Sequence, residues 1–210
     1  MTNTREMKCG DFIKAIASSA PTPGGGGGAA FGGALGMALV NMVGNLTLGK
    51  KKYANVELEA KKIIQEGDEI ISAMMDLIDA DAAVFAPLAE AYCLPKETPE
   101  QIAHKKVVME KCSKDACEVP MQIMRKAHAG ILLMKRMGEI GTSIAISDVG
   151  CGVTFMKSAL IASYLNVLNN LNSIKDQNYV ANKRQEMDHL YNEGSSIADQ
   201  TLNQVIERIK

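Results

Sequence analysis

Apolar residues recur every three or four positions along most of the chain. The longest such pattern covers residues 56–90 and includes Leu58, Ile63, Ile64, Ile70, Ile71, Met74, Leu77, Ile78 and Phe85. This spacing places the side chains on one face of an α-helix. No stretch alternates apolar and polar residues for long enough to predict a strand. The pattern therefore predicts an all-α fold.

The same spacing predicts further helices at residues 11–19, 29–48, 98–129, 147–172 and 179–209. The helix at 98–129 starts with Thr98 and Pro99, which is typical of a helix N-terminus, and Pro120 predicts a bend within it. No internal repeat, Gly/Ser linker or charge block divides the chain. We therefore expect a single domain over residues 1–210, an antiparallel bundle of long helices.

The composition agrees with a helical core, because 47% of the 210 residues are apolar but only 4% are aromatic, with 13 Met and no Trp. Strands favour aromatic and β-branched side chains. The 23 basic and 24 acidic residues leave a formal charge of −1. That balance excludes a broadly basic nucleic-acid-binding protein, so we expect no nucleic-acid partner.

The cysteines and the uncharged segments bear on the compartment. Five cysteines without CxxC spacing predict reduced thiols rather than a disulfide framework. No apolar segment of an export signal follows residues 1–11. Residues 24–49 carry no charge and are long enough to cross a bilayer, but about a third of them are glycine. Small residues favour a buried helix that its neighbours approach closely, so we expect a cytoplasmic protein without a membrane span.

Five consecutive glycines, Gly24 to Gly28, follow Pro21 and Pro23. Glycine inside a helix costs about 1 kcal/mol relative to alanine, so the run is expected at a helix entrance. Backbone N–H groups there attract an anion or a polar ligand, whereas the alternative is a flexible connector. Later glycines are expected to let helices pack closely, at Gly32, Gly33, Gly36 and Gly44.

One carboxylate stands out in the helix at 56–90. Ile71, Met74, Ile78, Asp81 and Phe85 form one stripe, in which Asp81 is the only acid. An unpaired buried carboxylate is costly, so Asp81 must be paired, be neutral through a raised pKa, or face a polar cavity. A general acid/base has such an environment. The alternative is a structural aspartate in a salt bridge between helices.

A basic segment follows the small-residue helix. Residues 44–51 differ from a P-loop because Lys51 stands where Ser or Thr would bind Mg²⁺, and no strand precedes them. Lys50 and Lys51 therefore either bind an anionic substrate group or form a solvated helix end. The three histidines show no metal-binding spacing, so we expect no metal site.

The later helices carry isolated polar residues. Ser147 and Asp148 precede a long apolar pattern, where they can serve as a helix cap. Asn166 and Asn170 lie one turn apart among apolar residues, so each amide is expected to bond either another helix or a ligand.

Five segments together resemble the family of formiminotetrahydrofolate cyclodeaminases and methenyltetrahydrofolate cyclohydrolases. They are SAPTPGGGGGAA at 19–30, NLTLGKKKY at 45–53, DADAAVFAPLAEAYCLPK at 79–96, ISDVG at 146–150 and NVLNN at 166–170. The segments follow the family's order and span nearly the whole chain. The resemblance implies an all-helical, homodimeric enzyme that binds a tetrahydrofolate derivative, with or without a polyglutamate tail, and needs no other cofactor.

The resemblance also implies roles for single residues. Asp81 falls on the family's essential carboxylate, and the lysines suit the glutamate tail. We expect Asp148 to bind the amino group and ring N–H of the pterin. In chain order, the implied site residues are Gly24, Gly25, Gly26, Lys50, Lys51, Asp81, Ser147, Asp148, Asn166 and Asn170.

Both activities of the family act on the one-carbon bridge between N5 and N10 of tetrahydrofolate. We expect hydrolysis of 5,10-methenyltetrahydrofolate to 10-formyltetrahydrofolate, because SSAPTPGGGG and LTLGKKKY look closer to free-standing cyclohydrolases. The alternative activity is deamination of 5-formiminotetrahydrofolate with release of ammonia. A non-catalytic folate-binding module would keep the glycines and lysines but would not need Asp81.

Overall fold

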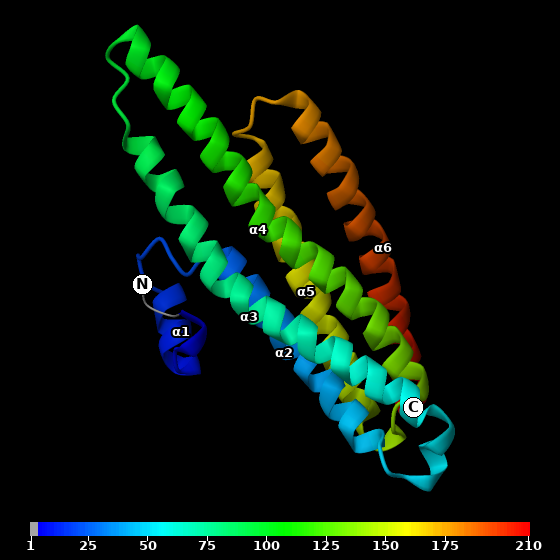
Figure 1. Cartoon of the computed structure of the whole chain (residues 1–210). Coiled ribbons are helices and arrows are strands. Elements are labelled where there is room, and N and C mark those ends of the chain that lie inside the picture. Colours follow the sequence, from blue (N-terminus) through cyan, green and yellow to red (C-terminus); the bar gives the residue numbers. More distant parts are fainter. Residues whose placement is uncertain (1–3) are drawn as a thin grey trace.

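The computed structural model describes residues 4–210, which form helices and no strand. Within them, five long helices run up and down beside one another (Figure 1): α2 (Gly25–Thr47), α3 (Glu57–Cys93), α4 (Pro99–Ile140), α5 (Ile146–Leu171) and α6 (Gln177–Ile209). Shorter elements complete the chain: η1 (Thr4–Glu6), α1 (Cys9–Ile16), η2 (Lys51–Val56) and η3 (Ser143–Ala145). The prediction of an all-α antiparallel bundle is confirmed.

The predicted helices occur in the predicted order, with differences at their ends. α2 begins at Gly25 rather than at 29, because the glycine run forms its first turn. α4 begins as predicted, and Thr98 and Gln101 cap it through reciprocal hydrogen bonds. It continues to Ile140 rather than ending near 129. A Cβ at Gly130 would lie 2.7 Å from the terminal methyl of Met156, so this glycine is a packing position inside the helix rather than its end.

Small residues allow α2 to lie between α3 and α5. A Cβ at Gly36 would lie 2.7 Å from the carbonyl oxygen of Gly152. A Cβ at Gly152 would lie 2.7 Å from the carbonyl oxygen of Gly36. Gly33 and Gly44 also face side chains of neighbouring helices, as predicted. The same expectation for Gly32 is wrong, because no atom lies within 4 Å of where its Cβ would be.

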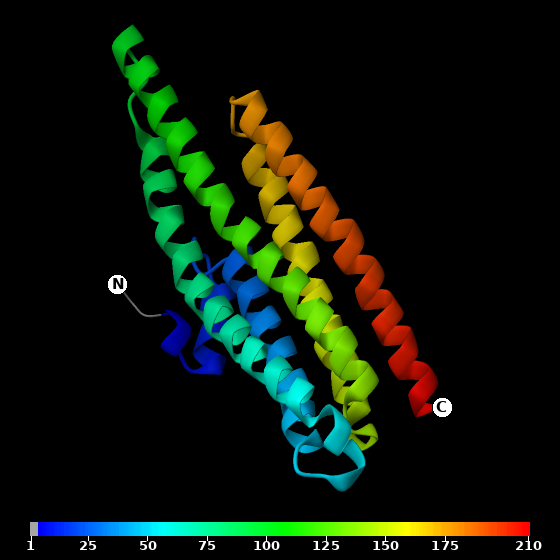
Figure 2. The same cartoon turned by 45° about the vertical axis from the view of Figure 1, so that its right-hand side comes forward.

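α2 starts only part-way along its two neighbours (Figures 1 and 2). Asp81 of α3 lies beside the first turn of α2, and α3 then continues to Cys93, about three more turns. α5 likewise continues past Asn166, which lies beside Gly25. The pocket described below lies at the N-terminus of α2, where Asp81 of α3 and Asn166 of α5 both line it.

Two segments, Gly25–Thr47 and Ser143–Leu171, are long and apolar enough to cross a membrane by length and composition. In the bundle, 56% of the apolar window of the first and 50% of that of the second are buried. The core helix of a soluble protein passes the same test. The small-residue helix predicted at 29–48 is α2, which packs between two other helices.

Candidate active site

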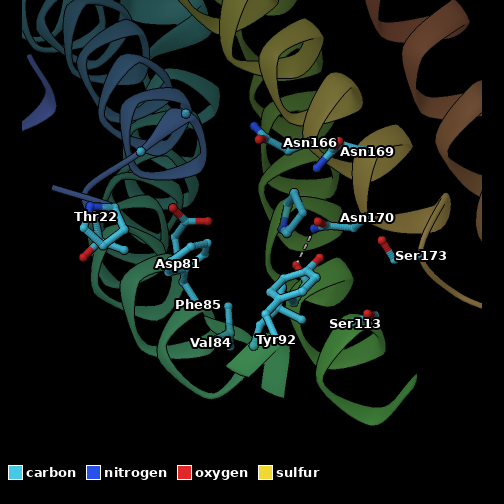
Figure 3. Close-up of a pocket in the computed structure, with 16 residues that line it drawn as sticks. Thr22, Asp81, Val84, Phe85, Tyr92, Ser113, Asn166, Asn169, Asn170 and Ser173 are labelled. Atoms are coloured by element: carbon cyan, nitrogen blue, oxygen red, sulfur yellow. Dashed lines mark hydrogen bonds between the residues drawn. The ribbon is translucent and has the colours of Figure 1, made fainter. Parts of the chain in front are cut away.

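A pocket of about 250 Å³ lies at the start of α2 (Figure 3). Its residues are Pro21, Thr22, Gly24, Gly25, Asp81, Val84, Phe85, Leu88, Tyr92, Ser113, Ala116, Pro120, Asn166, Asn169, Asn170 and Ser173. The volume lies just below the usual range of about 300–1,000 Å³ for ligand pockets, which suits a ring system rather than a whole extended ligand. Among residues 4–210, no three His, Cys, Asp or Glu side chains gather closely enough to hold a metal ion.

The carboxylate of Asp81 lies against the first turn of α2. The backbone N–H of Gly27 donates to Asp81 Oδ2 at 2.9 Å. Gly24 is the N-cap of α2 and has no side chain, so Asp81 supplies from α3 the negative charge that a helix N-terminus favours. No cation among the described residues pairs with Asp81, so the alternative of a salt bridge between helices is wrong, and the carboxylate accepts this capping bond instead.

The surroundings of Asp81 favour its neutral form. Burial raises the pKa of this carboxyl group above its ordinary value of 3.8, and the bond from Gly27 opposes the rise. The carboxylate also borders a pocket with amide and hydroxyl groups on its other side (Figure 3). A carboxyl group in this position is suited to take up a proton from a bound molecule and return it.

The first glycines of the run make room for the carboxylate and the pocket. A Cβ at Gly26 would lie 2.1 Å from Asp81 Oδ1, so no other residue fits there without displacing the side chain. Gly24 and Gly25 line the pocket. Gly28 faces α1 instead. The run is thus a helix entrance, as its helix propensity predicts, but only its first part reaches the pocket.

Asn166 and Asn170 bring amides from α5 to the pocket. The amide nitrogen of Asn170 donates to the carbonyl oxygen of Ala116 in α4 at 2.9 Å. That of Asn166 donates to the carbonyl oxygen of Ala162 within α5, also at 2.9 Å. Asn170 therefore joins two helices and lines the pocket at the same time.

The other four predicted site residues lie away from this pocket. Lys50 and Lys51 follow the far end of α2, about 35 Å along the helix from Gly25. The Lys50 ammonium donates to the Thr142 hydroxyl at 3.4 Å. Ser147 and Asp148 lie in the first turn of α5, towards the same end of the bundle. Within one chain, none of the four meets Asp81.

The interpretation of Ser147 as a helix cap is wrong. α5 begins at Ile146, so Ser147 lies inside the first turn and Ala145 is the N-cap. Ala145 has no side-chain group to accept a backbone N–H. The helix starts one residue before the predicted position, and η3 (Ser143–Ala145) leads directly into it.

The sequence patterns do not point to Ser113, Tyr92 and Asn169 in the pocket, or to Tyr53 at the opposite end of α2. The backbone N–H of Ser143 donates to Tyr53 Oη at 3.2 Å, and this bond is the main reason that the pKa of Tyr53 falls to about 7. Tyr53 ends the lysine motif, so its position was visible in the sequence. Its altered pKa was not, because it depends on contact with the connection between α4 and α5.

Comparisons with known proteins identify the family. The formiminotransferase-cyclodeaminase family model matches residues 8–189. The methenyltetrahydrofolate cyclohydrolase of Methylorubrum extorquens is 34% identical over 198 residues, which are 94% of this chain and 95% of that protein. The formimidoyltransferase-cyclodeaminase of Gallus gallus is 30% identical over 88% of this chain, but the match covers 34% of that protein. The crystal structure of formiminotetrahydrofolate cyclodeaminase from Thermotoga maritima aligns with a TM-score of 0.80 and 26% identity, over 97% of this chain and 96% of that one. The chain belongs to the formiminotransferase-cyclodeaminase family.

Proposed function

We propose that the protein hydrolyses 5,10-methenyltetrahydrofolate to 10-formyltetrahydrofolate, reversibly. The observation that carries this proposal is the carboxylate of Asp81, held at a helix N-terminus on one side of a pocket with polar groups opposite. The relationship to the Methylorubrum extorquens cyclohydrolase supports it, because the two proteins match over nearly their whole lengths.

In this reaction Asp81 acts first as a general base. Water attacks the cationic methenyl carbon between N5 and N10, and the Asp81 carboxylate takes up a proton from this water. The bond from this carbon to N5 then breaks, and Asp81 returns its proton to N5. The hydroxyl proton is released to solvent as the formyl group forms on N10. The carboxylate charge also favours binding of the cationic carbon.

Deamination of 5-formiminotetrahydrofolate is the second candidate. The family relationship to the Thermotoga maritima and Gallus gallus cyclodeaminases supports it. In that reaction N10 attacks the carbon of the protonated formimino group, and Asp81 takes up the N10 proton and returns it to the formimino nitrogen. The bond from the carbon to this nitrogen then breaks, so that ammonia leaves and the 5,10-methenyl cation remains. We place the cyclohydrolase first because the identity to the relative of that name is 34%, against 30% for the Gallus gallus protein and 26% for the Thermotoga protein.

The absorbance band of 5,10-methenyltetrahydrofolate distinguishes the two reactions. We expect the wild-type protein to accelerate the loss of this band when methenyltetrahydrofolate is the substrate. Growth of the band from 5-formiminotetrahydrofolate, with release of ammonia, would support the deaminase instead. If the protein binds a folate but changes neither rate, both catalytic proposals are wrong and a folate-binding module remains.

We also propose a homodimer formed through the outer face of α2 and α5. The side chains of Leu35, Met42, Leu46 and Phe155 on this face are between 41% and 45% exposed. α2 carries no charged residue. Phe155 of α5 lies next to Gly36 of α2, where the two helices are in contact. Exposed apolar faces of this kind mark interaction sites. A second copy presents the same uncharged face, so a two-fold axis can pair the copies without charge repulsion.

Such a pairing would bring together the two separated groups of predicted site residues. If Leu35 of one copy packs against Met42 of the other in antiparallel α2 helices, Ala30 lies level with Thr47 of the second copy, so Gly25 lies about 7.5 Å beyond the C-terminal end of that helix. Lys50 and Lys51 of that copy would then lie near the pocket. There they would bind the glutamate tail of the substrate, as the resemblance implies.

Leu35→Glu combined with Met42→Glu tests the dimer. The double variant places like charges opposite each other, so we expect it to sediment as a monomer and to lose activity, whereas the wild type sediments as a dimer. Leu132→Glu is the control, because Leu132 of α4 is similarly exposed at 44%. This variant is expected to remain a dimer. A monomeric wild type, or a double variant that stays dimeric, would contradict the proposal.

A further inference from the structure

Pro120 leaves one backbone acceptor of α4 without its helical partner. A residue at position 120 would normally donate its N–H to the carbonyl oxygen of Ala116, but proline has no N–H. The amide nitrogen of Asn170 donates to this oxygen instead, as the dashed line in Figure 3 marks. That bond orients the Asn170 amide: its nitrogen faces Ala116, so its Oδ1 is the atom available to accept a hydrogen bond.

Ser113 lies one turn before Ala116 on α4 and also lines the pocket. The residue is 2% exposed, and its Oγ has no hydrogen-bond partner within residues 4–210. A buried hydroxyl without a partner is unfavourable, and most such groups in proteins are paired. Because Ser113 adjoins the pocket, a molecule bound there would supply the missing partner.

Ser113 and Asn170 lie across the pocket from Asp81 (Figure 3). The pocket wall also contains the apolar side chains of Val84 and Phe85. A flat ring can therefore lie along apolar side chains, with one polar edge towards Ser113 and Asn170 and its reacting atoms towards Asp81.

We propose that Ser113 and Asn170 bind the polar edge of the pterin ring, an inference that rests on the proposed folate activity. The Ser113 hydroxyl donates to an acceptor on this edge, and Asn170 Oδ1 accepts from a neighbouring N–H. The pyrimidine edge of a pterin presents a carbonyl oxygen beside a ring N–H, which matches this donor and acceptor. Within one chain, Asn170 therefore accepts from the ring N–H, which is one of the two pterin groups that Asp148 was expected to bind.

Ser113→Ala tests the proposal, with Ser163→Ala as its matched control. Ser163 of α5 is also fully buried with an unpartnered Oγ, but it does not line the pocket. Tetrahydrofolate serves as a non-reacting probe. We expect Ser113→Ala to weaken its binding about 10-fold and to raise KM for methenyltetrahydrofolate similarly, with a smaller change in kcat. Ser163→Ala is expected to change neither tetrahydrofolate binding nor KM. The thermal midpoint of both variants should be no lower than that of the wild type.

The outcomes separate this inference from the proposed function. Unchanged tetrahydrofolate binding by Ser113→Ala, or equal weakening by Ser163→Ala, overturns the inference while an active wild type still supports the function. A wild type that binds tetrahydrofolate through Ser113 but converts neither folate overturns the function alone. A wild type that does not bind tetrahydrofolate overturns both.

Pro120→Ala tests how Asn170 is oriented. The variant restores an N–H that competes for the Ala116 carbonyl oxygen, so we expect weaker tetrahydrofolate binding. Pro87→Ala makes the same change at an exposed position of α3 and should leave binding unchanged. Equal binding by Pro120→Ala and the wild type would show that Pro120 does not orient Asn170.

Discussion

Asp81→Asn is expected to lower kcat on 5,10-methenyltetrahydrofolate by about 10²- to 10⁴-fold. Asparagine has the same shape and can still accept the Gly27 N–H, but it cannot take up a proton and return it. The measurement is kcat at saturating substrate. Asp79→Asn is the control, because the Asp79 carboxylate instead accepts the backbone N–H groups of Thr4 and Arg5. It should retain activity.

Asp81→Asn is expected to raise the stability of the protein, although it lowers its activity. Because burial raises the pKa of Asp81, the folded protein holds this proton to a higher pH than the unfolded chain does. The wild type therefore loses stability as the pH rises from the ordinary value, 3.8, through the raised pKa. Asp81→Asn avoids this loss, so it should match the wild type at low pH and exceed its stability above the raised pKa.

The activity of the wild type has the reverse pH dependence. A general base must be ionised, so kcat/KM is expected to fall as the pH drops through the raised pKa of Asp81. Thermal midpoints and kcat/KM measured over the same pH series check both trends. An active Asp81→Asn protein, or one that is less stable than the wild type at neutral pH, would contradict this account of Asp81.

Asp81 could be singled out from the sequence because its signal is local. A single helical period places it on an apolar stripe, and the propensity of glycine alone places Gly24 at a helix entrance. Ser113 could not be found this way. Helical spacing can place a serine on a buried face, but whether its hydroxyl has a partner depends on the helices around it. Pro120 was predicted as a bend, yet its effect on Asn170 requires α5 to lie beside α4.

The direction of each helix decides which predicted site residues can meet. α2 starts at the pocket and runs away from it, so Lys50 and Lys51 lie at the distant end. α5 starts at that end and returns, so Asn166 and Asn170 join Asp81 while Asp148 does not. Sequence motifs show that these segments belong to one family, but they do not show the length of helix between them.

Gly26→Ala is expected to reduce kcat/KM by about 10²-fold or more. The added Cβ would lie 2.1 Å from Asp81 Oδ1 and 2.5 Å from its Cγ, so the carboxylate must move away from α2. That movement breaks the hydrogen bond from Gly27 and displaces the proposed general base. A displacement of about 1 Å can cost 10²-fold in rate.

The same variant should be less stable than the wild type. Overpacking costs about 1–3 kcal/mol, and the better helix propensity of alanine offsets about 0.5–1 kcal/mol of it. Gly28→Ala is the matched control, because its Cβ would meet only the end of the Ile16 side chain at 3.8 Å, an ordinary contact. This control should keep full activity and gain stability, as measured by urea unfolding.

A double-variant cycle identifies the cause of the Gly26→Ala defect. In an Asp81→Ala background the carboxylate is absent, so the Cβ added by Gly26→Ala no longer clashes with it. The substitution should then cost little stability or increase it through helix propensity. Urea unfolding of the four proteins measures this coupling. If Gly26→Ala is equally destabilising in both backgrounds, the glycine is required by the geometry of α2 itself rather than by its contact with Asp81.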